Sequence, residues 1–316
     1  MPSTRRSLTR TLLTGAALAP LGFLRPGAAV AQMAPGAILP DVRALLEAAR
    51  SVGRPLPPQA RLSLERTLQR MDDLEIDVTA GRQIVVNIPG AEVIAYEDGR
   101  EVMRSRVIVG GPRTRTPQLA TFVTTVRFNP PWYVPASIEP EIRAKGLSGF
   151  QVVNGRLIQP PGPRNPLGPL RVGLEESDAI YLHGTANPEL FTRGERNLSH
   201  GCIRVERIVD LSAWLLDTTP AAIRAGIGLG RTVDLAGQKD VRVALGYLTA
   251  WPNAAGRVVF HPDPYGFDQP GGRRVPFRRV QRPLPPEFEP PPPEMEGDTI
   301  ATLDAPLDLS RGRDPL

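Results

Sequence analysis

Apolar residues recur at helical spacing in two stretches near the N-terminus, 41–53 and 59–74. The positions that form the two apolar faces are Val42, Leu45, Leu46, Leu62, Leu64, Leu68 and Met71. Residues three or four apart share one face of a helix, so both stretches are predicted to be amphipathic helices. Asp41 is a suitable N-cap for the first. Together they define a helical segment predicted over 32–80.

From about residue 82 the pattern becomes that of strands, with short β-rich runs separated by turn residues. The predicted strands span 83–88, 92–97, 100–109, 122–128, 151–158, 179–182, 241–251 and 257–260. Asp98-Gly99 and Asn154-Gly155 are strong signals for two-residue hairpin turns, because these residue types tolerate the positive φ that such turns need.

One helix is predicted among the strands, over 205–216, where apolar residues form a broad face. Strands joined by short turns with few helices indicate a mainly β fold, either open or built of two sheets. The proline- and glycine-rich stretch 130–170 lacks periodicity. It predicts a lid-like insertion or binding loop, with an irregular surface excursion as the alternative.

The composition suits a globular protein of 316 residues, of which 41% are hydrophobic, enough for one sizeable core. The formal net charge is +5, but residues 1–31 hold four arginines and no acid and so account for all but one of these charges. The remainder is close to neutral, which gives no reason to expect nucleic acid as a partner.

Residues 1–31 are predicted to be a signal peptide, with a basic start, an apolar stretch and an Ala29-Val30-Ala31 cleavage site. The apolar stretch is short and interrupted by Pro20, so it is a poor membrane span. Arg5-Arg6 is compatible with either a twin-arginine (Tat) or a Sec signal. We therefore expect a periplasmic or cell-wall-associated protein, without a stable membrane span after signal removal.

The C-terminal segment 269–316 is arginine-rich, then proline-rich, then acidic. Such a composition cannot bury a core, so the segment is predicted to be a disordered tail. Nothing in it identifies a partner.

Cys202 is the only cysteine, and His183 and His200 lie within the same 20-residue window. Exported proteins normally pair their cysteines, so a lone one either fills a core position or is kept for its chemistry. A helix predicted to start just after Cys202, together with the charge of Arg204, should lower the pKa of the thiol. A histidine within reach could take its proton. One cysteine and two histidines could also ligate zinc, but their spacing fits no common zinc pattern, so no metal or cofactor is expected.

Two strings, His183-Gly184-Thr185 and Ser199-His200-Gly201-Cys202-Ile203-Arg204, are separated by thirteen residues. Together they resemble the signature of the L,D-transpeptidase (YkuD-type) catalytic domain, in particular its larger murein-type members. The likeness extends over about 65–268. It includes the segments 84–109, 128–135, 159–170 (QPPGPRNPLGPL) and 249–266. Arg204 departs from the asparagine that many members have there.

The resemblance implies a YkuD-like mixed β-sheet sandwich, with residues 81–268 as the catalytic domain. It implies Cys202 as the nucleophile and His183 as the general base, oriented through the backbone carbonyl of Gly184. His200, Gly201 and the amide of Cys202 would lie around the oxyanion, and Ser199 would help to hold the loop.

Three further side chains are candidates for substrate contacts. Arg204 is expected to meet a substrate carboxylate, while Tyr181 and Trp132 are expected in the pocket wall, with plain core packing as the alternative. His261 is expected to be an ordinary structural histidine.

The implied activity is that of a cysteine-dependent, carbapenem-sensitive acyltransferase acting on peptidoglycan peptide stems, with a role in cell-wall biogenesis and cell shape. It would form 3→3 cross-links through a thioester on tetrapeptide stems. The alternatives are an L,D-carboxypeptidase or other hydrolase, attachment of a protein to peptidoglycan, and a non-catalytic wall-binding module.

Overall fold

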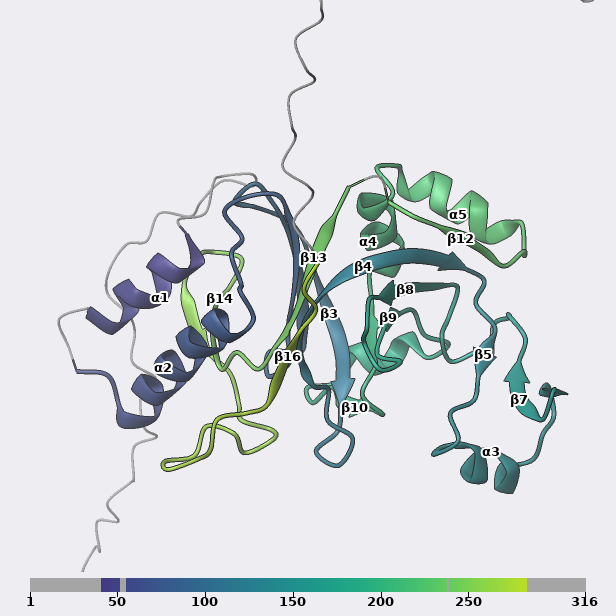
Figure 1. Cartoon of the computed structure of the whole chain (residues 1–316), viewed down its shortest axis with the longest axis horizontal. Coiled ribbons are helices and arrows are strands. Elements are labelled where there is room, and N and C mark those ends of the chain that lie inside the picture. The colour runs from purple at the N-terminus through teal and green to yellow at the C-terminus, as the bar shows by residue number, and fades with distance from the viewer. Residues whose placement is uncertain (1–40, 52–54, 238, 283–316) are drawn as a thin grey trace, which may run out of the picture.

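The computed structural model describes residues 41–51, 55–237 and 239–282, and its centre is a closed ring of eight strands (Figure 1). Around the ring the order is β3-β11-β9-β8-β4-β13-β1-β2, and pairing of β2 with β3 closes it. The ring strands are β1 (Arg82–Asn87), β2 (Glu92–Glu97), β3 (Arg100–Gly110), β4 (Gln118–Phe128), β8 (Leu170–Leu174), β9 (Leu182–His183), β11 (Ile203–Val205) and β13 (Val241–Gly246). The fold is mainly β, with parallel and antiparallel pairs mixed, as predicted.

Shorter strands extend this sheet at its two longest members. β10 (Asn197–Ser199) pairs with β3, while β12 (Val233–Leu235) and β16 (Phe277–Arg279) pair with β4. A separate hairpin joins β14 (Ala250–Pro252) to β15 (Val258–Phe260). The predicted strand over 241–251 is therefore two strands, β13 and β14.

The alternation of side chains along β1 explains why this strand is buried on both faces. Ile84 and Val86 belong to the core inside the ring, whereas Val85 belongs to a second core outside it. Successive residues of a strand point to opposite faces, so a run of apolar residues suits a strand covered on both sides.

Two helices supply the outer cover, α1 (Val42–Ser51) and α2 (Pro58–Asp73), in agreement with the two predicted helices. Their buried residues include Leu46, Leu64 and Met71, which pack with Trp251 of β14 in the outer core. Figure 1 shows the pair at one end of the molecule, away from the α3 region.

Three further helical segments follow the ring strands: η1 (Pro188–Thr192), α4 (Ile208–Leu215) and α5 (Pro220–Gly228). The sequence predicted a helix from 205, but Val205 still belongs to β11 and the helix begins at Ile208. Helix α5 was not predicted.

The proline-rich stretch 130–170 contains a three-stranded sheet in the order β5-β7-β6 and one helix. Its elements are β5 (Trp132–Tyr133), α3 (Glu139–Lys145), β6 (Gln151–Val153) and β7 (Arg156–Gln159). In Figure 1 this insertion stands beside the ring, beyond the end of β4. The buried amide of Asn165 fastens its base, donating to the carbonyl oxygens of Pro130, Gln159 and Pro160 at 3.0–3.2 Å.

Strand β16 corrects the prediction that the tail is disordered from 269. Residues 277–279 pair in parallel with β4, and Val280 is buried. The arginines that made this segment look unable to fold are paired with acids: Arg274 with Asp73, and Arg282 with Glu175. Residues 283–316 and the predicted signal peptide 1–31 lie outside the described residues. No helix in the described part of the chain is long and apolar enough to cross a membrane.

Candidate active site

A cavity of about 710 Å³ lies between the ring and the insertion. Its wall includes seven of the predicted site residues, brought together from β5, β9, β11 and the loops beside them: Trp132, Tyr181, His183, Ser199, His200, Cys202 and Arg204. The insertion contributes the opposite wall, from Pro131 to Glu139 and at Pro166 and Leu167. The predicted lid-like stretch therefore faces the predicted nucleophile.

Hydrogen bonds hold the loop 199–202 in a tight turn before β11. The hydroxyl of Ser199 donates to the carbonyl oxygen of Cys202 at 2.6 Å and accepts from the amide of Gly201 at 3.1 Å. Gly201 has φ +115°, which favours glycine. Because its amide is used inside the loop, Gly201 does not offer an oxyanion donor in this conformation. No hydrogen bond in the described part of the chain uses the amide of Cys202, which remains available for that role.

The surroundings of Cys202 differ from those predicted. A short strand, β11, follows it, and helix α4 begins six residues later, so no helix N-terminus stabilises a thiolate. Burial raises the pKa of the thiol above its ordinary value, against the opposing effects of Tyr181 and of the Arg204 and Arg171 charges. The thiol donates to the carbonyl oxygen of Ala179 at 3.5 Å.

His183 ends β9 and is buried, with its side chain on the same cavity as Cys202. Burial lowers the pKa of the imidazole to about 3, and the charge of Arg204 adds to the lowering. The carbonyls of Gly184 and Leu167 partly oppose it. Nδ1 has no hydrogen-bond partner among the described residues, so the predicted orientation through the Gly184 carbonyl is not present as a regular hydrogen bond.

These two shifts define the starting state of the site. At neutral pH a thiol with a raised pKa and an imidazole with a lowered pKa are both uncharged. The site therefore starts without a preformed thiolate–imidazolium pair, and any transfer of the thiol proton to the imidazole would have to accompany attack on a carbonyl.

The other predicted side chains take up different positions on the wall. His200 is exposed at its rim. The ring of Tyr181 meets that of His183 edge-on, with centroids 5.5 Å apart. Trp132 lies near Phe150 of the insertion, with centroids 6.3 Å apart. His261 follows β15 and does not line the cavity.

Sequence reasoning missed Arg171 of β8, which also lines the cavity. Its guanidinium lies over the ring of Tyr181, 5.3 Å from the centroid. Burial lowers its pKa. No motif marks an arginine in a short apolar strand, and only the strand pairing places it here.

Two threonines of the loop between β3 and β4 support the loop 199–202 from behind, and sequence reasoning also missed these; because it carries the predicted nucleophile, the loop 199–202 is called the nucleophile loop below. Thr114 donates to the carbonyl oxygen of Ser199 at 2.8 Å, and buried Thr116 donates to that of Gly201 at 2.7 Å. The hydroxyl of Tyr265 accepts from the amide of Thr116 at 3.2 Å and donates to the carbonyl oxygen of Gly110 at 2.6 Å. The nucleophile loop thus depends on a tyrosine more than 60 residues away in sequence.

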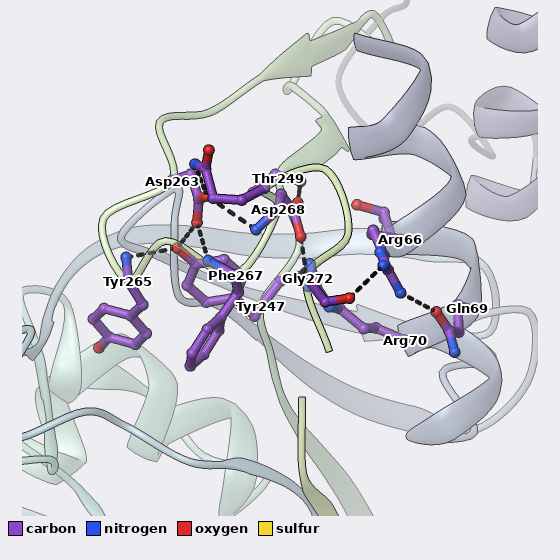
Figure 2. Close-up of polar contacts among 12 residues, drawn as sticks. Arg66, Gln69, Arg70, Tyr247, Thr249, Asp263, Tyr265, Phe267, Asp268 and Gly272 are labelled. Carbon is purple, nitrogen blue, oxygen red and sulfur yellow. Dashed lines mark hydrogen bonds and ion pairs between the residues drawn. The ribbon is translucent and has the colours of Figure 1, made fainter. Parts of the chain in front are cut away.

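Figure 2 shows how this tyrosine is fixed in turn. The amide of Tyr265 donates to the hydroxyl of Tyr247 at 2.8 Å, and that hydroxyl donates to Asp263 at 2.5 Å. Arg70 of α2 donates to the carbonyl oxygen of Tyr247 at 2.7 Å and pairs with Asp268 at 2.5 Å. A continuous buried network therefore joins the N-terminal helices to the loop behind Cys202.

In the described part of the chain no group of three or more His, Cys, Asp or Glu side chains is arranged to hold a metal ion.

Comparisons with known proteins identify the type of domain that contains this cavity. Residues 81–223 match the family model of the YkuD L,D-transpeptidase catalytic domain. A Haemophilus influenzae protein provisionally named an L,D-transpeptidase is 31% identical over 218 residues, which cover 59% of this chain and 44% of that protein. The match therefore spans less than half the length of this relative.

Two solved structures illustrate more distant likeness. An L,D-transpeptidase from Mycobacterium smegmatis is 16% identical, with a TM-score of 0.31 over 52% of this chain and 58% of that one. L,D-transpeptidase 3 from Mycobacterium tuberculosis is 16% identical, with a TM-score of 0.29 over 52% and 60%. The assignment rests on the sequence matches and not on these scores. Residues 81–223 therefore form a domain that matches the YkuD family of L,D-transpeptidase catalytic domains.

Proposed function

We propose that the protein is a cysteine-dependent L,D-transpeptidase that forms 3→3 cross-links between peptidoglycan peptide stems. The observation that carries this proposal is the placement of Cys202 and His183 on one cavity, inside a domain of this family. No other cysteine is available as a nucleophile.

In the proposed first step Sγ of Cys202 attacks the carbonyl carbon between the third residue of a tetrapeptide stem, a diamino acid, and the fourth, D-Ala. The S–C bond forms and the C–N bond breaks. The thiol proton passes to His183, which returns it to the nitrogen of the leaving D-Ala. The amide of Cys202 is free to stabilise the oxyanion of the tetrahedral intermediate. The product is a thioester acyl-enzyme and free D-Ala.

In the second step the side-chain amine of another stem attacks the thioester and releases Cys202. His183, which is neutral at physiological pH, is suited to accept the proton of that amine. The insertion over the cavity would limit the access of water, which otherwise hydrolyses the intermediate.

The group that accepts the acyl chain from Cys202 distinguishes cross-linking from the other reactions that the same site could perform. Water would make the protein an L,D-carboxypeptidase, and a protein amine would attach that protein to the wall. We further propose that the chain is exported through its N-terminal segment by the Tat or Sec route and acts in the periplasm or cell wall, in peptidoglycan synthesis and the maintenance of cell shape.

Mass spectrometry of products from purified muropeptides tests the proposal. Incubation with tetrapeptide stems should yield dimers joined through two third residues, together with free D-Ala. Tripeptides without dimers would identify a carboxypeptidase. No turnover, combined with no reaction of Cys202 with a carbapenem, would identify a wall-binding module and reject the enzyme.

A further inference from the structure

Five charged or titratable residues form one row across neighbouring strands of the ring: Asp234, Arg127, Arg171, His183 and Arg204. Each is the direct partner of the next in the strand registers. Directly paired residues project from the same face of a sheet, with Cβ atoms of neighbours about 5 Å apart. The row therefore places one arginine on either side of His183.

The charges in this row are not balanced. The carboxylate of Asp234 accepts from Nε of Arg127 at 2.6 Å, so it is already paired. Among the described residues, the guanidinium groups of Arg171 and Arg204 lie more than 4.0 Å from any carboxylate, and neither guanidinium donates a hydrogen bond. Nε of Arg171 is buried and has no partner.

The acids of the cavity wall do not supply the missing charge. Glu139 is bonded to Arg143 at 2.8 Å, and Asp178 is paired with Arg278 at 2.9 Å. A partly buried guanidinium without a partner is costly unless an anion completes it, and a carboxylate matches its fork of N–H donors. Arg171 is thus a cationic side chain on the wall of the Cys202 cavity that lacks an anionic partner among the described residues.

The position of Arg171 in the row indicates which carboxylate it serves. Arg204 is on β11, the strand that follows the nucleophile loop, whereas Arg171 is on β8, across His183 from that loop. In the proposed mechanism His183 protonates the nitrogen of the leaving residue, so that residue must lie beside His183. Its α-carboxylate is only one carbon away from this nitrogen.

We propose that Arg171 binds the α-carboxylate of the leaving residue, so that the fourth position of the donor must carry a free carboxylate. This inference rests on the proposed function for the identity of the donor. It predicts that the site rejects a stem extended beyond the fourth residue, in which the same carboxyl group is part of a peptide bond and carries no charge.

Two synthetic donors test this directly: tetrapeptide stems that end in D-Ala or in D-alaninamide. Both give the same thioester on Cys202, so intact-protein mass spectrometry compares the acylation rates without interference from later steps. The wild type should prefer the carboxylate, and Arg171→Gln should reduce this preference about tenfold. Arg171→Lys should keep part of it, since it keeps the charge but not the fork.

The control is Arg61→Gln, which removes an exposed arginine of α2 outside the cavity and should leave the preference unchanged. Circular dichroism should show that the variants are folded. An Arg171→Gln protein that is acylated with the wild-type preference would overturn the inference.

A second experiment separates the anion site from the proposed function. Iodoacetate and iodoacetamide both alkylate Cys202 by displacement of iodide, and they differ in charge. Any effect of Arg171 on the thiol pKa changes both rates equally, so the ratio of rates reports the anion site alone. The ratio of iodoacetate to iodoacetamide should fall about fivefold in Arg171→Gln. An unchanged ratio would overturn the anion site, whereas a falling ratio with no acylation by either donor would reject only the transpeptidase.

Discussion

Arg70 is a buried arginine and Arg171 a partly buried one, and the two differ in whether the fold provides a partner for the charge. Arg70 is 3% exposed, pairs with Asp268 at 2.5 Å and donates to a backbone carbonyl. Arg171 faces the cavity with Nε unpartnered, and no carboxylate of the described residues lies within salt-bridge distance. Removing a charge from water is unfavourable at both positions, but only the charge of Arg70 is compensated by a carboxylate of the described chain.

The presence or absence of an internal partner indicates whether a charged side chain serves the packing of the fold or the binding of a ligand. A charge whose partner lies within the fold fixes the packing of two elements, here α2 against the C-terminal loop. A charge that lacks such a partner is available to a ligand. The same contrast holds for the hydrogen bonds of the nucleophile loop: the amide of Gly201 is satisfied by Ser199, whereas the amide of Cys202 is free.

The largest expected effect comes from breaking the paired region. Asp268→Ala should lower the free energy of unfolding by about 3–5 kcal/mol, because it leaves the buried charge of Arg70 without a partner. Urea denaturation measures the loss. Asp210→Ala, at a solvent-exposed ion pair with Arg207, is the matched control and should change stability far less. Similar losses in the two variants would contradict the role assigned to the buried pair.

Acid should destabilise the protein through His183. The pKa of this histidine is about 3 in the folded protein and about 6.5 when unfolded, so the unfolded state binds the proton first as pH falls. The stability is fully present above pH 6.5 and is lost as pH falls toward 3. Between pH 7 and pH 5 the loss from this group should be about 2 kcal/mol.

Chemical denaturation at several pH values measures this loss, with His183→Asn expected to flatten the dependence. The pKa of His261 is also lowered by burial, so His261→Asn should flatten it in part. A His183→Asn protein with the wild-type pH dependence would show that this imidazole is not held neutral.

The hydrogen bond behind the nucleophile loop should matter for rate. Thr116→Val removes the donor to the Gly201 carbonyl while keeping the side-chain shape, and acylation of Cys202 should slow about tenfold through misplacement of the loop. Thr116→Ser keeps the hydroxyl and should restore most of the rate. The acylation rate constant should fall while the apparent donor affinity stays the same. Equal rates for the two variants would leave Thr116 without a positioning role.

The smallest effect should come from the unpaired region. Arg171→Gln should change the free energy of unfolding by less than about 1 kcal/mol, since among the described residues only the contact with the Tyr181 ring is lost, and no ion pair or hydrogen bond. Thermal unfolding compares it with Asp268→Ala. A decrease in the free energy of unfolding as large as that of Asp268→Ala would mean that Arg171 stabilises the fold.

The sequence predicted those parts of the fold that local pattern controls. The two-residue turns at Asp98-Gly99 and Asn154-Gly155 have positive φ at all four residues, and strand β2 has the predicted bounds. Helix α5 was not predicted, and it contains Pro220 and two glycines, residue types that disfavour a helix interior. The proline occupies the first turn, where its missing N–H is harmless, and Thr219 caps the helix by accepting from the amide of Ala222.

The features that the sequence did not predict depend on contacts between segments that are distant in sequence. The composition of the arginine-rich segment after 269 predicted that it does not fold. In the structure its strand pairs with β4, and two of its arginines form ion pairs with Asp73 and Glu175. Arg171 and His183 are twelve residues apart in sequence and adjacent only through the pairing of β8 with β9. The prediction of a lowered pKa for the Cys202 thiol was wrong. A strand rather than a helix follows Cys202, and burial raises the pKa of its thiol.

The most direct test of the account is intact-protein mass spectrometry of the reduced protein with a tetrapeptide stem, alongside Cys202→Ala. We expect a transient adduct with the mass of the stem without its D-Ala on the wild type, and none on the variant. An adduct that persists in Cys202→Ala, or none on well-folded wild type under any donor concentration, would contradict the cysteine acyl-enzyme on which the account rests.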